Sequence, residues 1–220
     1  NTAIGALSLD ANTTASYGTA IGWSALTSNT TGANNTAVGH NTLATNTTGS
    51  ENVAVGRIAL YANTTGTNNI GIGYGALDAN TTASYNVAIG RDALGANTTG
   101  SQNTAVGRNA LRDNTTASYN VAFGNAALQS NSGGATNSAF GYGSLSANTT
   151  GSYNNAFGYA ALDANTDGTH NCGFGRDALG ANTGGDNKEV ILKRVNDIKD
   201  ITVDSFNLAN KTWSMKYENE

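Results

Sequence analysis

The chain contains no proline, one cysteine, few charged residues and no long apolar run, and each shortage excludes a class of protein. A single cysteine cannot build a disulfide framework within the chain. Without a run of about 18 apolar residues there is no candidate membrane-spanning helix. Charged residues make up 12% of the 220 residues, and the formal net charge of −4 argues against a nucleic-acid partner. We therefore expect neither membrane insertion nor nucleic-acid binding.

Glycine is abundant instead, and one glycine recurs every 17 residues without insertion or deletion. Positions in the repeat are counted from this glycine, which is position 0. Position −1 is always Ile, Val or Phe, position +4 is always Leu, and position +7 is always Asn. A disordered chain has no physical reason to keep these positions in phase. The repeat glycines are Gly5, Gly22, Gly39, Gly56, Gly73, Gly90, Gly107, Gly124, Gly141, Gly158 and Gly175.

The pattern inside the repeat favours strands over helices. Residues 53–55 alternate large and small side chains with the period of two that is typical of a strand. Asn63, Thr64, Thr65 and Gly66 follow as turn-forming residues, and their copies interrupt any helical periodicity. The missing proline also fits, because proline would remove a hydrogen-bond donor from every interior coil. We predict an all-β fold, a parallel β-solenoid of eleven coils over residues 1–187, on the order of 50 Å long.

A solenoid buries the apolar rows of one coil against the next, so the core should contain the rows at −1 and +4. Positions −2 and 0 lie on the opposite face of the same strand and carry only Ala or Gly, as at Ala88 and Gly90. A strand that is apolar on both faces is usually buried on both faces. We expect this small-residue face to pack against neighbouring chains in a homotrimer. The alternative is that Ala and Gly fit the tight corners of a narrow coil.

The composition changes after Asn187. Residues 188–220 contain all five lysines of the chain, and the Leu and Asn rows stop there. The spacing of Ile191, Val195 and Ile198 allows a short helix, whereas the alternation of Trp213, Met215 and Tyr217 predicts a strand. We expect residues 188–220 to form a small cap or a trimerisation segment. No such cap precedes Asn1, so we expect the natural chain to continue upstream of it.

The repeat resembles units of known fibre proteins. Val87, Ala88, Ile89 and Gly90, preceded by Ser84, Tyr85 and Asn86, are similar to the YadA-like head repeat of trimeric autotransporter adhesins. The longer unit from Asn103 to Thr116 resembles repeats in bacteriophage tail-fibre proteins. This resemblance implies a left-handed β-roll, three chains side by side, and an extracellular, cell-surface or virion fibre that attaches to surfaces. The adhesin-head repeat is shorter than 17 residues, which favours the phage-fibre alternative.

One row of the repeat varies strongly, and variable positions on a regular scaffold face solvent. Position +1 carries aromatic and Arg side chains that could bind a cell-surface glycan, a receptor or another partner; ordinary surface and stacking between chains are the alternatives. Position +12 varies in the same way, with tyrosines at Tyr17, Tyr85, Tyr119 and Tyr153. The candidate ligand or partner residues at +1 are Trp23, His40, Arg57, Tyr74, Arg91, Arg108, Tyr142, Tyr159 and Arg176.

No arrangement of residues predicts catalysis, a metal or a cofactor. His40 and His170 are far apart along the repeat, and Cys172 at position −3 is expected to be a small core hydrophobe. Asn12, Thr13 and Thr14 match a glycosylation sequon, but its copies in adjacent coils would lie about 4.8 Å apart. We therefore expect instead an inward or edge-on ladder of Asn side chains that hydrogen-bond to one another. We therefore predict a non-enzymatic fibre protein.

Two other functions stay open from the sequence. A self-assembling filament subunit is one, because the first coil has no cap and could accept the end of another subunit. An ice-binding solenoid is the other, because stacked Thr rows on a flat face could match an ice lattice. Thr13 and Thr14 are adjacent, however, and neighbouring residues of a strand point to opposite faces, whereas an ice-binding face needs Thr at alternate positions.

Overall fold

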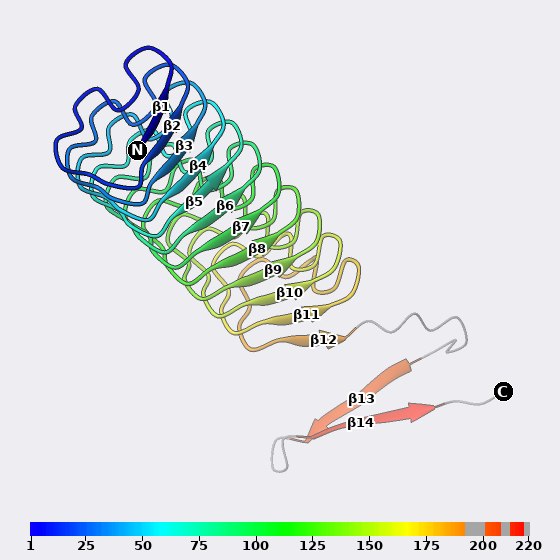
Figure 1. Ribbon diagram of the computed structural model, residues 1–220. Coiled ribbons are helices and arrows are strands. Elements are labelled where there is room, and N and C mark those ends of the chain that lie inside the picture. Colours follow the sequence, from blue (N-terminus) through cyan, green and yellow to red (C-terminus); the bar gives the residue numbers. More distant parts are fainter. Residues whose placement is uncertain (192–200, 208–211, 218–220) are drawn as a thin grey trace.

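The computed structural model describes residues 1–191, 201–207 and 212–217. It is a β-solenoid in which each 17-residue repeat makes one coil and contributes one short strand (Figure 1). The strands are β1 (Thr2–Ile4), β2 (Thr19–Ile21), β3 (Thr36–Val38), β4 (Val53–Val55), β5 (Ile70–Ile72), β6 (Val87–Ile89), β7 (Thr104–Val106), β8 (Val121–Phe123), β9 (Ser138–Phe140), β10 (Asn155–Phe157), β11 (Cys172–Phe174), β12 (Glu189–Ile191), β13 (Ile201–Asn207) and β14 (Thr212–Tyr217).

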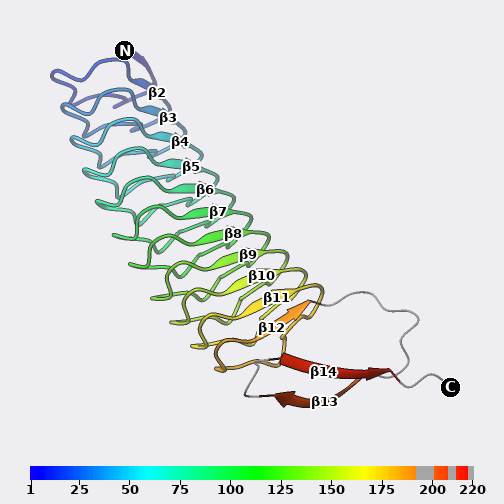
Figure 2. The ribbon, with the colours of Figure 1, turned by 90° about the horizontal axis from the view of Figure 1, so that it is seen from below.

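Strands β1 to β12 form one parallel sheet in chain order, and every pair is in register, as in Ala88 opposite Ala105. The rest of each coil consists of turns, and these also bond to their neighbours. Leu94 N donates to Ala110 O at 3.0 Å, and Asp92 N donates to Tyr74 O at 2.9 Å. The coils therefore stack as a straight rod without a break (Figure 2). The predicted parallel β-solenoid of eleven coils is confirmed.

The sheet extends past the predicted boundary at residue 187. Strand β12 pairs in register with β11, and Val190 packs against the core at a position where earlier coils have Ala or Gly. Strands β13 and β14 pair antiparallel, so the strand predicted around Trp213 to Tyr217 is confirmed. Ile191 belongs to β12, whereas Val195 and Ile198 of the predicted helix lie outside the described residues. A capping or trimerising role for residues 188–220 stays a prediction.

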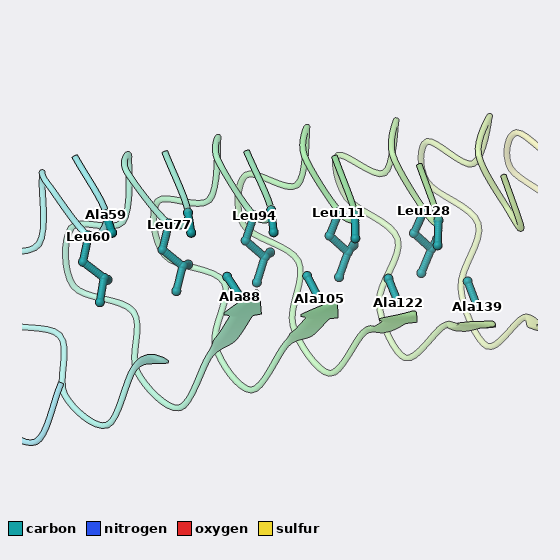
Figure 3. Packing of buried hydrophobic residues seen from close by; sticks show 14 of the residues in the cluster. Ala59, Leu60, Leu77, Ala88, Leu94, Ala105, Leu111, Ala122, Leu128 and Ala139 are labelled. Carbon is teal, nitrogen blue, oxygen red and sulfur yellow. The ribbon is translucent and has the colours of Figure 1, made fainter. Parts of the chain in front are cut away.

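The core contains one of the two predicted apolar rows. Leu at +4 is fully buried from Leu26 to Leu162, and it faces the strand Ala at −2, which is buried to the same extent (Figure 3). The row at −1 was assigned to the core, and this is wrong. Ile89 is 38% exposed and Phe123 is 39% exposed, because positions −3 and −1 point outward from the sheet.

The width of the coil explains why the −2 row faces the interior and the −1 row faces outward. Leu94 projects across the interior toward the sheet, and Ala88 and Ala93 are the small side chains that fit around it. A second large side chain on the inner face of the strand would overfill this space. The small residues thus fit a narrow coil, as the alternative interpretation held, and they do not form an outer face for a neighbouring chain.

The repeat glycine is required by the approach of adjacent coils. Gly90 has a φ of 134°, which side chains other than hydrogen rarely allow, and a Cβ there would lie 2.6 Å from the carbonyl oxygen of Gly107. Leu94, in contrast, adopts the left-handed region with a φ of 51° in spite of its side chain. The same conformation recurs at every Leu of this row, and it directs the Leu into the coil.

Two rows of buried asparagines connect the coils. Asn46 at +7 donates from Nδ2 to Asn29 Oδ1 in the preceding coil at 2.7 Å and to Gly49 O at 2.8 Å. Asn35 at −4 donates to the same Gly49 carbonyl at 2.7 Å, which links the start of the coil to its end. Its own Oδ1 accepts from Asn52 N at 3.0 Å. The inward ladder at +7 is confirmed, whereas the row at −4 was not predicted.

The +7 ladder ends on a lysine. In the last coil, Asn182 donates to Asn165 Oδ1 at 3.1 Å, and its own Oδ1 has no further Asn to accept from. Lys188 takes the place of the next −4 Asn, and its Nζ donates to Asn182 Oδ1 at 2.7 Å. The first lysine of the chain and the Gly185 N–H, which donates to the same oxygen at 3.2 Å, thus satisfy the terminal acceptor of the buried ladder.

Candidate binding surfaces

The variable row at +1 lies on the outside of the rod, since all nine candidate residues there are exposed. Their side chains stack along the rod from coil to coil. Trp23 stacks on His40 with ring centroids 4.8 Å apart, and Tyr142 stacks on Tyr159 at 5.3 Å. The solvent exposure inferred for this row is confirmed, and a ligand-binding role for it stays a prediction.

Stacking within the row covers most of its aromatic faces. The guanidinium groups of Arg57 and Arg91 each lie 5.6 Å from the Tyr74 ring centroid, one from each neighbouring coil. Tyr159 is covered by Tyr142 on one side and by Arg176, at 5.4 Å, on the other. A flat ligand can therefore stack on these two rings only by displacing a neighbour.

Ion pairs hold two of these arginines. Arg91 Nε contacts Asp92 Oδ2 at 3.2 Å, and Arg176 Nε contacts Asp177 Oδ2 at 3.2 Å. The same Tyr, Arg and Asp arrangement thus occurs twice on the row, five coils apart. Because these ion pairs are exposed, each contributes at most about 1 kcal/mol to stability, but they fix the direction of the guanidinium groups.

The row is interrupted beside Tyr142. The preceding coil has Asn125 at +1, so the Tyr142 face opposite Tyr159 is not covered by a ring or a guanidinium group. A hollow of about 340 Å³ opens here between two adjacent coils. It is lined by Ala126, Gln129, Ser130, Tyr142, Gly143, Ser146 and Ala147.

A second exposed row follows position +12. Tyr17, Tyr85, Tyr119 and Tyr153 are all exposed, and Tyr17 most of all, at 80%. Tyr153 stacks on His170 of the next coil with centroids 4.8 Å apart. The rod therefore carries two exposed rows in which aromatic side chains are interspersed with polar ones.

The outward face of the sheet carries an apolar row along the rod. We call it the apolar strip: the Ile, Val and Phe residues at −1 together with the apolar residues at −3, which are Val53, Ile70, Val87, Val121 and Cys172; the other −3 residues are Thr, Ser or Asn. Phe123, Phe140, Phe157 and Phe174 stack in it with centroid distances between 4.4 and 5.2 Å. Sequence reasoning missed this surface because it assigned the row to the core.

Cys172 lies in the apolar strip and not in the core slot predicted for it. It is half-buried, and burial raises the pKa of its thiol, with a further contribution from the Glu189 carboxylate. The neighbouring His170 belongs to the +12 row, where its Nδ1 lies 3.1 Å from Thr169 Oγ1. A raised pKa keeps the thiol protonated at neutral pH, which is unfavourable for a nucleophile.

The Asn-Thr-Thr segments are used inside the solenoid. Each Asn at +7 from Asn29 to Asn165 is buried, so none of these amides is accessible to a glycosylating enzyme. The Thr at +8 donates its hydroxyl to the next coil, as Thr81 does to Thr98 O at 3.1 Å. The Thr at +9, such as Thr99, is exposed in each of these segments, and the +8 side chain is exposed as well at Thr13, Thr115 and Thr149. One Thr of each pair thus forms a hydrogen bond between stacked coils.

Within the described ranges no three His, Cys, Asp or Glu residues are placed to hold a metal ion. The same part of the chain has no helix long and apolar enough to cross a bilayer. No protein-family model, curated protein or solved structure matches this chain.

Proposed function

We propose that this chain is a rigid, non-enzymatic segment of an extracellular or virion-borne fibre that attaches to a surface. The proposal rests on the difference in variability between the buried rows and the exposed rows of the rod. The buried Leu, Ala, Gly and Asn rows repeat almost without change, whereas the exposed +1 and +12 rows vary from coil to coil. A constant scaffold that displays variable aromatic and Arg side chains is suited to recognition, because such side chains dominate binding surfaces.

We propose further that three copies pack side by side through the apolar strip. Ile, Val and Phe side chains of the −1 row are between 36% and 59% exposed at Ile4, Val55, Ile72, Ile89, Phe123 and Phe174. Continuous apolar surface of this length is unusual for a monomer in water. Its straight, regular shape is suited to another copy of the same strip, and the resemblance to adhesin heads and phage fibres favours three copies.

A binding assay tests the attachment function. The fluorescently labelled chain is incubated with a panel of bacterial and eukaryotic cells, and bound fluorescence is measured after washing. We expect saturable attachment to at least one cell type. The double variant Tyr142→Ser and Tyr159→Ser should reduce it, because both side chains are exposed and removal of either leaves the core intact. If the chain attaches saturably to none of the cell types, or if the double variant attaches as well as wild type, the proposed role of this row is contradicted.

A further inference from the structure

The hollow beside Tyr142 borders an aromatic face that no other ring and no guanidinium group covers. The rings of Tyr142 and Tyr159 are stacked within 10° of parallel, so the second Tyr142 face points along the rod toward the preceding coil. The hollow lies on that side, since Ala126, Gln129 and Ser130 of the preceding coil line it. Tyr74 and Tyr159 have no comparable face, because neighbours cover both of theirs.

The floor of the hollow is open because position +2 is small in three successive coils. A Cβ placed on Gly143 would meet no atom within 4 Å. The equivalent Gly75 contrasts with it, since a Cβ there would lie 2.7 Å from Asp92 Oδ1. In the first case the next coil carries Ala160, and in the second it carries the larger Asp92. The free space is thus a local feature of these coils and not of the repeat.

One wall of the hollow carries an oriented amide. With the amide assigned so that its oxygen faces Arg112, Gln129 Oε1 accepts from Arg112 Nη1 at 3.0 Å and from Nη2 at 3.1 Å. Arg112 is itself held by Asp113, through Nε to Oδ1 and Nη2 to Oδ2, both at 2.7 Å. This chain of contacts leaves the Gln129 NH₂ group as a donor with a fixed direction. Ser130 and Ser146 add two hydroxyl groups to the lining.

We propose that this hollow is a binding subsite for a single neutral pyranose ring of a glycan; the proposal rests on the attachment function above and names its ligand class. An aromatic face beside amide and hydroxyl groups matches a sugar, which has an apolar face of C–H groups and a rim of hydroxyls. The lining has no charged side chain, and the nearby Arg112 is already paired, so nothing here favours an anionic sugar. The volume of about 340 Å³ is at the lower end of the range for ligand sites, as one ring requires.

Saturation-transfer difference NMR on the full chain tests the subsite, with the methyl glycosides of glucose, galactose, mannose and N-acetylglucosamine as probes. We expect at least one of them to bind the wild-type chain with a dissociation constant of about 1–10 mM, as is reasonable for one stacked ring with few hydrogen bonds. Gly143→Asn should fill the hollow and weaken binding about tenfold or more. Asn41 and Asn109 occupy the same repeat position with positive φ, so this variant is expected to fold. Tyr142→Ser should weaken binding equally, and it tests the subsite without altering the backbone at Gly143.

Two matched controls separate the hollow from the rest of the surface. Ile58→Asn makes the same side chain at the same repeat position five coils earlier, where φ is also positive, and Tyr74→Ser removes a ring with both faces covered. Both should leave binding within about twofold of wild type. The subsite is overturned if no glycoside binds, or if Gly143→Asn and Tyr142→Ser bind as wild type does. If Gly143→Asn attaches to cells as wild type does, the subsite is overturned but the attachment function is not. If glycosides bind but the chain does not attach to cells, the subsite is supported and the attachment function is contradicted.

Discussion

At the scale of single residues, the repeat glycine sets the distance between coils. Gly90→Ala would put a methyl group 2.6 Å from the Gly107 carbonyl oxygen at a φ of 134°. We expect a loss of about 3 kcal/mol in the free energy of unfolding, measured by denaturant titration. Gly95→Ala in the same coil is the control, because its Cβ would have no contact closer than 3.4 Å. Equal stability of the two variants would show that the coils can separate at little cost.

At the residue scale, the half-buried carboxyl of Asp78 makes the free energy of unfolding depend on pH. Burial raises the pKa of Asp78 above its usual 3.8; the Ala79 backbone N–H opposes the shift, and the Asp92 carboxylate adds to it. The folded chain therefore binds this proton more tightly than the unfolded chain, so the contribution of Asp78 to stability is present at low pH and is lost as pH rises through the folded-state pKa.

Asp78→Asn removes that dependence. We expect the variant to melt at a higher temperature than wild type at pH 7. The difference should vanish at pH 3, where Asp78 is mostly protonated in both states. Thermal melts followed by circular dichroism at the two pH values measure it. If the melting temperature of the variant rises by the same amount at both pH values, the cause is packing and not ionisation.

At the scale of the elements, the asparagine ladder at +7 links successive coils through buried side-chain amides. Asn97 donates to Asn80 Oδ1 at 3.1 Å and accepts from Asn114 Nδ2 at 2.9 Å. Asn97→Leu would leave both neighbours with an unsatisfied buried group, at about 1–3 kcal/mol each. We expect denaturant titration to show a loss of about 3 kcal/mol or more. Thr99→Leu, at an exposed position of the same turn, should change stability by less than about 0.5 kcal/mol, and a similar loss in both would argue against the ladder.

The elements also show which features a sequence can predict. The period, the parallel strands, the Leu row and the +7 Asn ladder follow from strict repetition of residue type. The inner and outer faces of the strand did not follow, because the rows at −2 and −1 are both apolar and alternate with the same period. The informative signal was variation in volume: position −2 carries only Ala or Gly, whereas −1 carries Val, Ile or Phe. A narrow interior accepts side chains of only one size, whereas an outer face accepts side chains of several sizes.

The hollow beside Tyr142 could not be predicted from the sequence for a related reason. Tyr142 was a candidate as one member of a row, but its open face depends on Asn125 before it and on the small Gly143 and Ala160 at +2. The orientation of Gln129 depends on Arg112 one coil away. These relations arise between coils, so they become visible only when the register of the stack is known.

At the scale of the whole molecule, the inverted faces change which surface should join the chains. Ala88, Ala105 and Ala122 are inside the coil, so charges placed there would disrupt the solenoid itself. The apolar strip is the surface to test, through the triple variant Ile89→Lys, Val106→Lys and Phe123→Lys. We expect this variant to keep its β-rich circular dichroism and to become monomeric. The matched control, Arg91→Lys, Arg108→Lys and Asn125→Lys on the +1 row of the same coils, should assemble as wild type does.

Sedimentation equilibrium of the wild-type chain at micromolar concentration tests the assembly most directly. Burial of the apolar strip between three copies predicts a particle of three times the 22.3 kDa chain mass. A mass well above three chains would favour a self-assembling filament. A stable, soluble particle with the mass of a single chain would contradict the trimer, because the strip from Ile4 to Phe174 would then be compatible with open solvent.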